Sequence, residues 1–209
     1  MKKIILCLMF MFLITGCGFV GRSKSSFDDL STITYGENKI KLFLTVQSTN
    51  LELNVSQASN PNNLRDLETG IFEKANTLSV KNGYKWYSDY LGNNIKISIS
   101  GVNNTGSDST INESIIEEIK AEKYNYENTN DKELKVKILN DLILNESSYN
   151  DVKAKLEKYD NVDINDYTTG ISITMFDGED KFTSENKLSA VFDFENNILI
   201  KFRVYKPDF

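Results

Sequence analysis

The regular alternation of apolar and polar residues is the sequence feature that most constrains this fold. Near the C-terminus every second residue is apolar from Leu188 to Phe194, and again from Ile198 through Ile200 to Val204. An extended strand points successive side chains to opposite faces, so a period of two gives each run one apolar face. Asn196-Asn197 separates the runs, and asparagine tolerates the positive φ of a tight turn. The sequence therefore predicts an antiparallel hairpin at this end of the chain.

The same alternation predicts further short strands. They are expected at residues 32–35, 39–46, 51–55, 95–99, 134–138 and 171–175. The run 39–46 should bury one face, which is formed by Ile40, Leu42, Leu44 and Val46. Such strands need neighbours that cover their apolar faces, so the chain should fold into layered antiparallel sheets.

Two segments between the strands are less simple. After Asn60-Pro61 breaks the chain, apolar residues at helical spacing predict a short helix from about residue 63 to 75. Residues 111–123 fit either type of element. Thr110 and Glu113 have the spacing of a helix capping box, but the residues from Ile115 to Ala121 also alternate as in a strand.

A second helix is predicted from about Tyr149 to Tyr159. Ser147 and Ser148 are N-cap candidates, and Asp151 follows Ser148 at capping-box spacing. The apolar stripe of this helix consists of Tyr149, Val152, Leu156 and Tyr159. We expect Val152 and Leu156 to face Ile173, Phe192 and Phe202 of the neighbouring strands, because one helix on one sheet is the simplest way to bury both.

The residues that follow this helix, Asp160 to Asp166, are predicted to form an acidic loop. Asn161, Asp163 and Asn165 have the spacing of the first three ligands of a calcium loop. However, Asp166 stands where that loop needs glycine, and Ser172 stands where it needs glutamate. We therefore expect neither a metal nor a cofactor.

The N-terminus has the layout of a secretory signal. Lys2 and Lys3 precede an apolar run from Ile4 to Ile14, which is about half of the roughly 20 residues that a spanning helix needs. The segment Ile14-Thr15-Gly16-Cys17 resembles the signal of bacterial lipoproteins. This resemblance implies that residues 1–16 are removed, that Cys17 receives a diacylglycerol, and that the protein is anchored at the extracytoplasmic face of the cell membrane. The alternative is an uncleaved anchor in which Cys17 is an ordinary thiol.

Charge and composition limit the function of the remaining chain. Loss of Lys2 and Lys3 would change the net charge from −6 to −8, and such an acidic chain repels nucleic acid. The chain has no histidine, and Cys7 and Cys17 are its two cysteines. No Gly-x-Ser-x-Gly motif is present. We therefore expect no nucleic-acid partner and no enzymatic activity, with a hydrolase as the last alternative.

A second resemblance concerns Leu142 to Lys158, where an extended lead-in precedes the pattern Ser-x-x-Asp-Val-x-x-x-Leu. Together with the strands that follow, this segment resembles the repeat of the β-lactamase-inhibitor-protein-like superfamily, which includes lipoproteins of the SmpA/OmlA type. The resemblance implies an α+β fold whose antiparallel sheets each carry a short helix on one face. It also implies two similar units in tandem, and a strand at 115–123. We expect a flexible tether at 17–31, an N-terminal strand-rich unit at 32–128 and a C-terminal unit at 129–209.

An aromatic cluster supplies the candidate partner-binding residues. Alternation should bury Tyr84 and Trp86, whereas Tyr87 and Tyr90 are the members expected at the surface. Tyrosine and tryptophan are common in binding hot spots, so Tyr87, Tyr90 and Trp86 are candidates; the alternative is a core role. The predicted function is a lipid-anchored, non-catalytic protein-binding or assembly module with an unknown envelope protein as its partner. An inhibitor of a secreted or envelope enzyme is the alternative, and it would need a concave sheet lined with exposed aromatics.

Overall fold

The computed structural model describes residues 24–48, 54–57, 73–74, 79–92, 94–124, 135–176 and 187–207. The signal at 1–16, Cys17 and the expected unit boundary at 128/129 lie outside these ranges. Most of the helix expected at about 63–75 also lies outside them, and residues 73–74 form a short strand instead.

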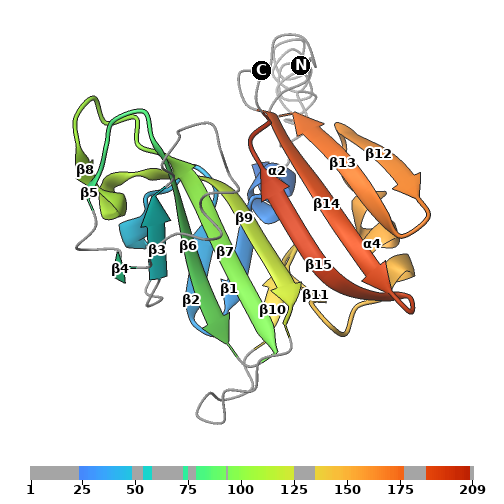
Figure 1. The fold of residues 1–209 in the computed structure, drawn as a ribbon. Coiled ribbons are helices and arrows are strands. Elements are labelled where there is room, and N and C mark those ends of the chain that lie inside the picture. The colour runs from blue at the N-terminus through green and yellow to red at the C-terminus, as the bar shows by residue number, and fades with distance from the viewer. Residues whose placement is uncertain are drawn as a thin grey trace, which may run out of the picture.

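A nine-stranded antiparallel sheet dominates the molecule (Figure 1). In spatial order its strands are β12 (Val162–Tyr167), β13 (Gly170–Phe176), β14 (Lys187–Glu195), β15 (Ile198–Tyr205), β9 (Ile115–Lys123), β7 (Ile95–Val102), β6 (Lys85–Gly92), β3 (Asn54–Gln57) and β4 (Glu73–Lys74).

Smaller elements form a second layer behind this sheet (Figure 1). A four-stranded sheet has the order β11 (Leu142–Ile143), β10 (Val136–Ile138), β1 (Thr32–Tyr35) and β2 (Asn38–Lys41). Two helices, α2 (Lys24–Leu30) and α4 (Tyr149–Leu156), also lie behind the large sheet. The remaining short elements are the 3₁₀ turns Val46–Ser48 and Ile111–Glu113 and the paired strands β5 (Ser79–Val80) and β8 (Ser109–Thr110).

The core lies between the two layers. It contains the buried side chains of Trp86, Ile97, Ile119, Phe202 and Val204 from the large sheet. The expected helix stripe joins it, since Val152 and Leu156 have no exposed surface. Among the residues that the structure describes, the second layer covers one face of the large sheet.

Strands from both halves of the sequence pair with each other. Phe202 of β15 lies opposite Ala121 of β9, and Ile33 of β1 lies opposite Ile138 of β10. The fold is consequently mainly β, with antiparallel sheets and two short helices, rather than a tandem of two α+β units. Sequence periodicity is local and carries no signal for pairing between such distant strands.

Several local predictions are confirmed. Ser148 caps α4 in a capping box with Asp151, and Asn196 and Asn197 have φ values of 50° and 66° at the turn between β14 and β15. The ambiguous residues 115–123 form strand β9, and Thr110 makes no side-chain capping bond. The order of lead-in, capped helix and antiparallel strands is as expected, with β12 as one additional strand.

The tether prediction is wrong for its last residues. Residues 24–30 form helix α2, Leu30 is fully buried, and the ring of Phe27 stacks on that of Phe43 at 6.1 Å. Most residues of this segment are small or polar, which led to the prediction of a tether. Phe27 and Leu30 nevertheless hold the helix in place, because the first packs on Phe43 and the second is buried in the core.

One strand prediction is wrong, and a second, correct strand buries a different residue than expected, because the backbone changes phase in both places. The strand expected at 39–46 ends at Lys41, Phe43 adopts a φ of 66°, and Leu44 is 45% exposed instead of buried. In the β14–β15 pair the register shifts between Asp193 and Phe194 of β14. Their partners in β15 are Lys201 and Leu199, so Ile200 is left unpaired. Leu199 is therefore buried in place of Ile198 and Ile200.

The predicted acidic loop at Asp160–Asp166 is also wrong. Residues 162–167 form edge strand β12, which pairs with β13 over its whole length. Its polar residues reflect an exposed position at the edge of the sheet and not a loop. Asp163 and Asn165 lie on this strand, and the spacing of a calcium loop has no structural counterpart here.

Candidate functional site

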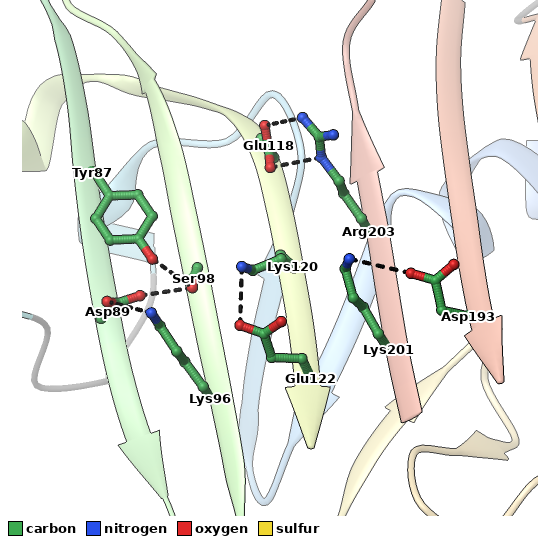
Figure 2. Close-up of polar contacts among 10 residues, drawn as sticks. All are labelled: Tyr87, Asp89, Lys96, Ser98, Glu118, Lys120, Glu122, Asp193, Lys201 and Arg203. Atoms are coloured by element: carbon green, nitrogen blue, oxygen red, sulfur yellow. Dashed lines mark hydrogen bonds and ion pairs between the residues drawn. The ribbon is translucent and has the colours of Figure 1, made fainter. Parts of the chain in front are cut away.

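The face of the large sheet that points away from the second layer carries a connected set of polar contacts. Alternate residues of five neighbouring strands, β6, β7, β9, β15 and β14, point away from the second layer (Figure 2). We call this surface the polar face and define it by Tyr87, Asp89, Lys96, Ser98, Glu118, Lys120, Glu122, Asp193, Lys201 and Arg203.

The strand register places opposite charges beside each other. Lys96 is opposite Glu122, Glu122 is opposite Lys201, and Lys201 is opposite Asp193. Lys201 bonds to Asp193 across the β14–β15 pair at 3.2 Å, whereas Lys120 bonds at 2.9 Å to Glu122 of its own strand β9. Cross-strand pairs of opposite charge contribute about 0.2–1 kcal/mol each. The polar face has equal numbers of acidic and basic side chains, so it is locally neutral on an acidic chain.

At one side of the polar face, the Asp89 carboxylate accepts contacts from two neighbouring side chains. It accepts a 2.6 Å hydrogen bond from Ser98 Oγ and an ion pair at 3.1 Å from Lys96, and only 8% of the residue is exposed. Tyr87 Oη in turn donates to Ser98 Oγ at 2.9 Å. Burial, together with the nearby Asp89 carboxylate, raises the pKa of Tyr87 to about 12. Burial alone would lower the pKa of Lys96, but its contacts with Tyr87 and Asp89 hold that pKa above its usual value. Both pKa values are raised, so the Tyr87 hydroxyl keeps its proton and Lys96 keeps its charge at neutral pH.

At the other side, Arg203 is held from two directions. Its Nε and Nη2 donate to the two carboxylate oxygens of Glu118 at 2.8 and 2.9 Å. Its guanidinium also lies 4.4 Å from the ring centroid of Tyr205. Hydrogen bonding to Glu118 raises the pKa of Arg203, so the charge is permanent. A planar guanidinium in such a fork is a well-oriented recognition group.

A small hollow adjoins Arg203 where the β7–β9 pairing shifts between Ser100 and Gly101. Its volume is about 130 Å³. A Cβ at Gly101 would collide with the Ile115 carbonyl and approach the Trp86 ring to 2.9 Å, so the bulge requires glycine. The hollow is lined by Lys85, Trp86, Ser100, Gly101, Val102, Glu117, Glu118, Arg203, Tyr205 and Lys206.

The three predicted partner-binding residues, Tyr87, Tyr90 and Trp86, do not lie on the same face of the sheet. Only Tyr87 lies on the polar face. Tyr90 points to the covered side, where its ring packs 5.2 Å from that of Tyr35. Trp86 is fully buried, so this residue has no surface to offer a partner. Trp86 and Tyr90 each lie two residues from Ser88, which is also buried, so all three side chains share one face of β6.

Sequence reasoning missed the charged members of the polar face. Residues such as Glu118, Lys120 and Lys201 have the composition of any solvated strand face. The informative signal is that opposite charges meet across strands, and it becomes visible only when the register is known.

Among the described residues, no group of three or more His, Cys, Asp or Glu side chains could hold a metal ion. No described helix is long and apolar enough to cross a membrane. Comparisons with protein-family models, curated proteins and solved structures found no match.

Proposed function

We propose that this chain is a lipid-anchored protein of the cell envelope that acts as a non-catalytic binding or assembly module, with the polar face as its docking surface. The observation that carries the proposal is the sheet face directed away from the second layer, on which half-buried charges are already paired and oriented. A module of the β-lactamase-inhibitor-protein-like type is the proposed family relationship, supported by the capped helix α4 and the strands after it.

Preordered side chains favour protein binding for an entropic reason. Association costs about 0.5–1.5 kcal/mol for each flexible side chain that becomes fixed. Lys96 and Arg203 are already held by Asp89 and Glu118, so less of this cost remains. The hollow beside Arg203 and Tyr205 offers a recess for one partner side chain, and arginine and tyrosine are the residue types of binding hot spots.

Affinity capture from the native membrane tests the docking surface. We compare the wild-type chain with a Lys120→Glu/Lys201→Glu variant, in which two charges of the polar face are reversed. The matched control is Lys39→Glu, because Lys39 is exposed on β2 in the other sheet. The proposal expects a captured envelope protein that the double variant loses and the control retains. Equal capture by all three would exclude the polar face.

The identity of the captured protein separates the two binding roles. A structural or assembly protein supports the module proposed here. A hydrolase whose activity falls when the purified chain is added would support the inhibitor alternative instead.

The anchor has its own test at Cys17. Mass spectrometry of the N-terminal peptide from the membrane fraction should show a diacylglyceryl cysteine and no residues 1–16. An unmodified Cys17, or an intact Met1, would contradict lipid anchoring. A Cys17→Ala variant should leave the membrane fraction, since acyl chains contribute about 0.8 kcal/mol per buried CH₂.

A further inference from the structure

The hollow beside Arg203 lies at one end of four neighbouring strands, β6, β7, β9 and β15. It forms where β7 carries Gly101, which lies directly opposite Trp86 of β6. Glycine omits the side chain that would fill this space, because a Cβ there would lie 2.9 and 3.1 Å from Cζ2 and Cε2 of Trp86. The indole of Trp86 is therefore one wall of the hollow.

This indole brings a hydrogen-bond donor that has no acceptor. Trp86 is fully buried, and its Nε1 has no hydrogen-bond partner in the described structure. Cε2, one of the ring atoms nearest to Gly101, is bonded to Nε1, so the donor lies on the side of the ring beside the hollow. A tryptophan nitrogen can only donate, and a buried donor without a partner is destabilising. The group that is missing here must therefore be an acceptor.

Three cationic side chains at the hollow also have free donors. Arg203 gives Nε and Nη2 to Glu118, and its Nη1 makes no hydrogen bond to the described residues (Figure 2). Within the described part of the chain, Lys85 and Lys206 take part in no ion pair or side-chain hydrogen bond. The acidic residues of the hollow are already engaged, Glu118 by Arg203 and Glu117 in an interaction of its own. The groups that could hold an occupant by charge are thus all donors.

This excess of donors selects the chemistry of the occupant. A carboxylate has two acceptor oxygens, no donor, and the charge that arginine and lysine attract. A carboxamide of the same shape would direct an NH₂ group at these donors, and a basic side chain would be repelled. The hydroxyl groups of Ser100 and Tyr205 can donate or accept, so they suit a carboxylate as well. The volume of about 130 Å³ exceeds the roughly 15 Å³ that one water needs, so the end of a side chain has room.

We propose that the hollow is a carboxylate-binding site that takes an acidic side chain, glutamate or aspartate, of the partner protein. The carboxylate accepts hydrogen bonds from Trp86 Nε1 and Arg203 Nη1, and Lys85 and Lys206 contribute their positive charge. This inference rests on the proposed role as a binding module, and it names the partner group that is recognised beside Arg203.

The indole itself is the probe of this site. Trp86 is the single tryptophan of the chain, so its Nε1–H gives one unambiguous signal in a proton–nitrogen correlation NMR spectrum. The purified full-length chain is titrated with glutamate that is blocked at its amino and α-carboxyl groups. Parallel titrations use equally blocked glutamine and inorganic phosphate. Blocked glutamate should shift the Nε1–H signal downfield to saturation and bind about tenfold more tightly than blocked glutamine.

Three results of these titrations would overturn the inference. An indole signal that blocked glutamate leaves unchanged would mean that the hollow holds only water. Equal binding of blocked glutamine would remove the role of charge. Phosphate that binds as tightly as blocked glutamate would make the hollow a general anion site without preference for a carboxylate.

Variants assign the binding to the hollow. Lys85→Gln/Lys206→Gln removes two unpaired charges and should weaken the binding of blocked glutamate about fivefold. Lys39→Gln/Lys158→Gln removes two exposed lysines elsewhere, on β2 and after α4, and should leave the affinity unchanged. Equal weakening by both double variants would reflect net charge alone and would contradict a site at the hollow.

The titration and the affinity capture fail independently of each other, because the titration needs no partner. Capture that depends on the polar face, together with an indole that does not respond, would overturn the inference and leave the proposed function intact. A carboxylate response without any captured protein would contradict the docking role and leave the hollow as a site for a free carboxylate.

Discussion

The two faces of the large sheet are built from the same strands but are stabilised by different forces. On the covered face Trp86, Ile119 and Phe202 are fully buried between the layers. On the polar face, one residue further along the same strands, Tyr87, Lys120 and Arg203 point to solvent and bond to neighbouring side chains. Burial of apolar area stabilises the covered face, whereas attraction between opposite charges stabilises the polar face.

From this difference we predict that stability depends on the covered face and that the proposed partner binding depends on the polar face. Changes on the covered face should lower the free energy of unfolding strongly, and salt should alter that effect little. Changes on the polar face should affect stability weakly, depend on salt, and act mainly on a partner. The predictions below test this division from the largest expected effect to the smallest.

The largest effect is expected at Phe202, whose ring lies 5.1 Å from that of Phe192 in the core. Phe202→Ala removes a fully buried aromatic side chain and should cost about 3–5 kcal/mol in unfolding free energy. Its neighbour Lys201 faces solvent, so Lys201→Ala should cost about 1 kcal/mol or less. Urea denaturation of the full-length chain measures both. Similar losses for the two variants would contradict the division between the faces.

The helix that covers the sheet gives the next test. Leu156 has no exposed surface, and Leu156→Ala should cost about 2–5 kcal/mol. Glu157 is the exposed residue that caps the C-terminus of α4, and Glu157→Ala should cost about 0.5 kcal/mol or less. The full-length chain is needed for these melts. A fragment starting near residue 130 would lack β1 and β9, which pair with β10 and β15. A small loss at Leu156 would mean that α4 does not cover the core.

Local sequence patterns predicted the elements better than their arrangement. The Ser148–Asp151 capping box, the Asn196-Asn197 turn and the strand at Ile95–Ile99 each depend on residues close together in the chain. The pairing of β15 with β9 joins strands about 80 residues apart, and no local pattern encodes it. The bulge at Ile200 could not be predicted either, because an unbroken alternation looks the same with or without a shift in pairing.

The candidate site was harder to predict than the fold for a related reason. Aromatic content pointed to Tyr87, Tyr90 and Trp86, but two of these three residues serve the covered side. The polar face depends on which charges meet across β6, β7, β9, β15 and β14. Its recognition therefore needs the register of all five strands, which the sequence alone does not provide.

A smaller and salt-sensitive effect is expected at the Glu118–Arg203 pair. These side chains are 25% and 37% exposed, so solvent weakens their attraction. A double-mutant cycle with Glu118→Gln and Arg203→Gln should give a coupling of about 0.5–1 kcal/mol at low salt. At about 1 M salt the coupling should fall, because the screening length shrinks to about 3 Å. The more exposed Lys123–Glu195 pair, at 3.4 Å, is the control and should couple by about 0.2 kcal/mol or less. If salt left the coupling energy unchanged, the Glu118–Arg203 pair would be shielded from solvent like the core, and the division between the two faces would be contradicted.

The smallest effect concerns pH and the cap of α4, where a charge helps to fix an element of the covered side. Hydrogen bonds from Ser148 Oγ and the Ser148 backbone N–H lower the pKa of Asp151 below its usual 3.8. A group whose pKa is lower in the folded state stabilises the protein above its unfolded pKa, and that contribution is lost as the pH falls through the folded pKa. Asp151→Asn should therefore be less stable than wild type near pH 7, and the difference should shrink at about pH 2 because both side chains are then neutral. Urea midpoints at the two pH values measure this change, with Glu37→Gln as an exposed control that should not show it. If the Asp151→Asn difference were as large in acid as at neutral pH, the carboxylate charge would have no part in capping α4, and the covered side would depend on packing alone.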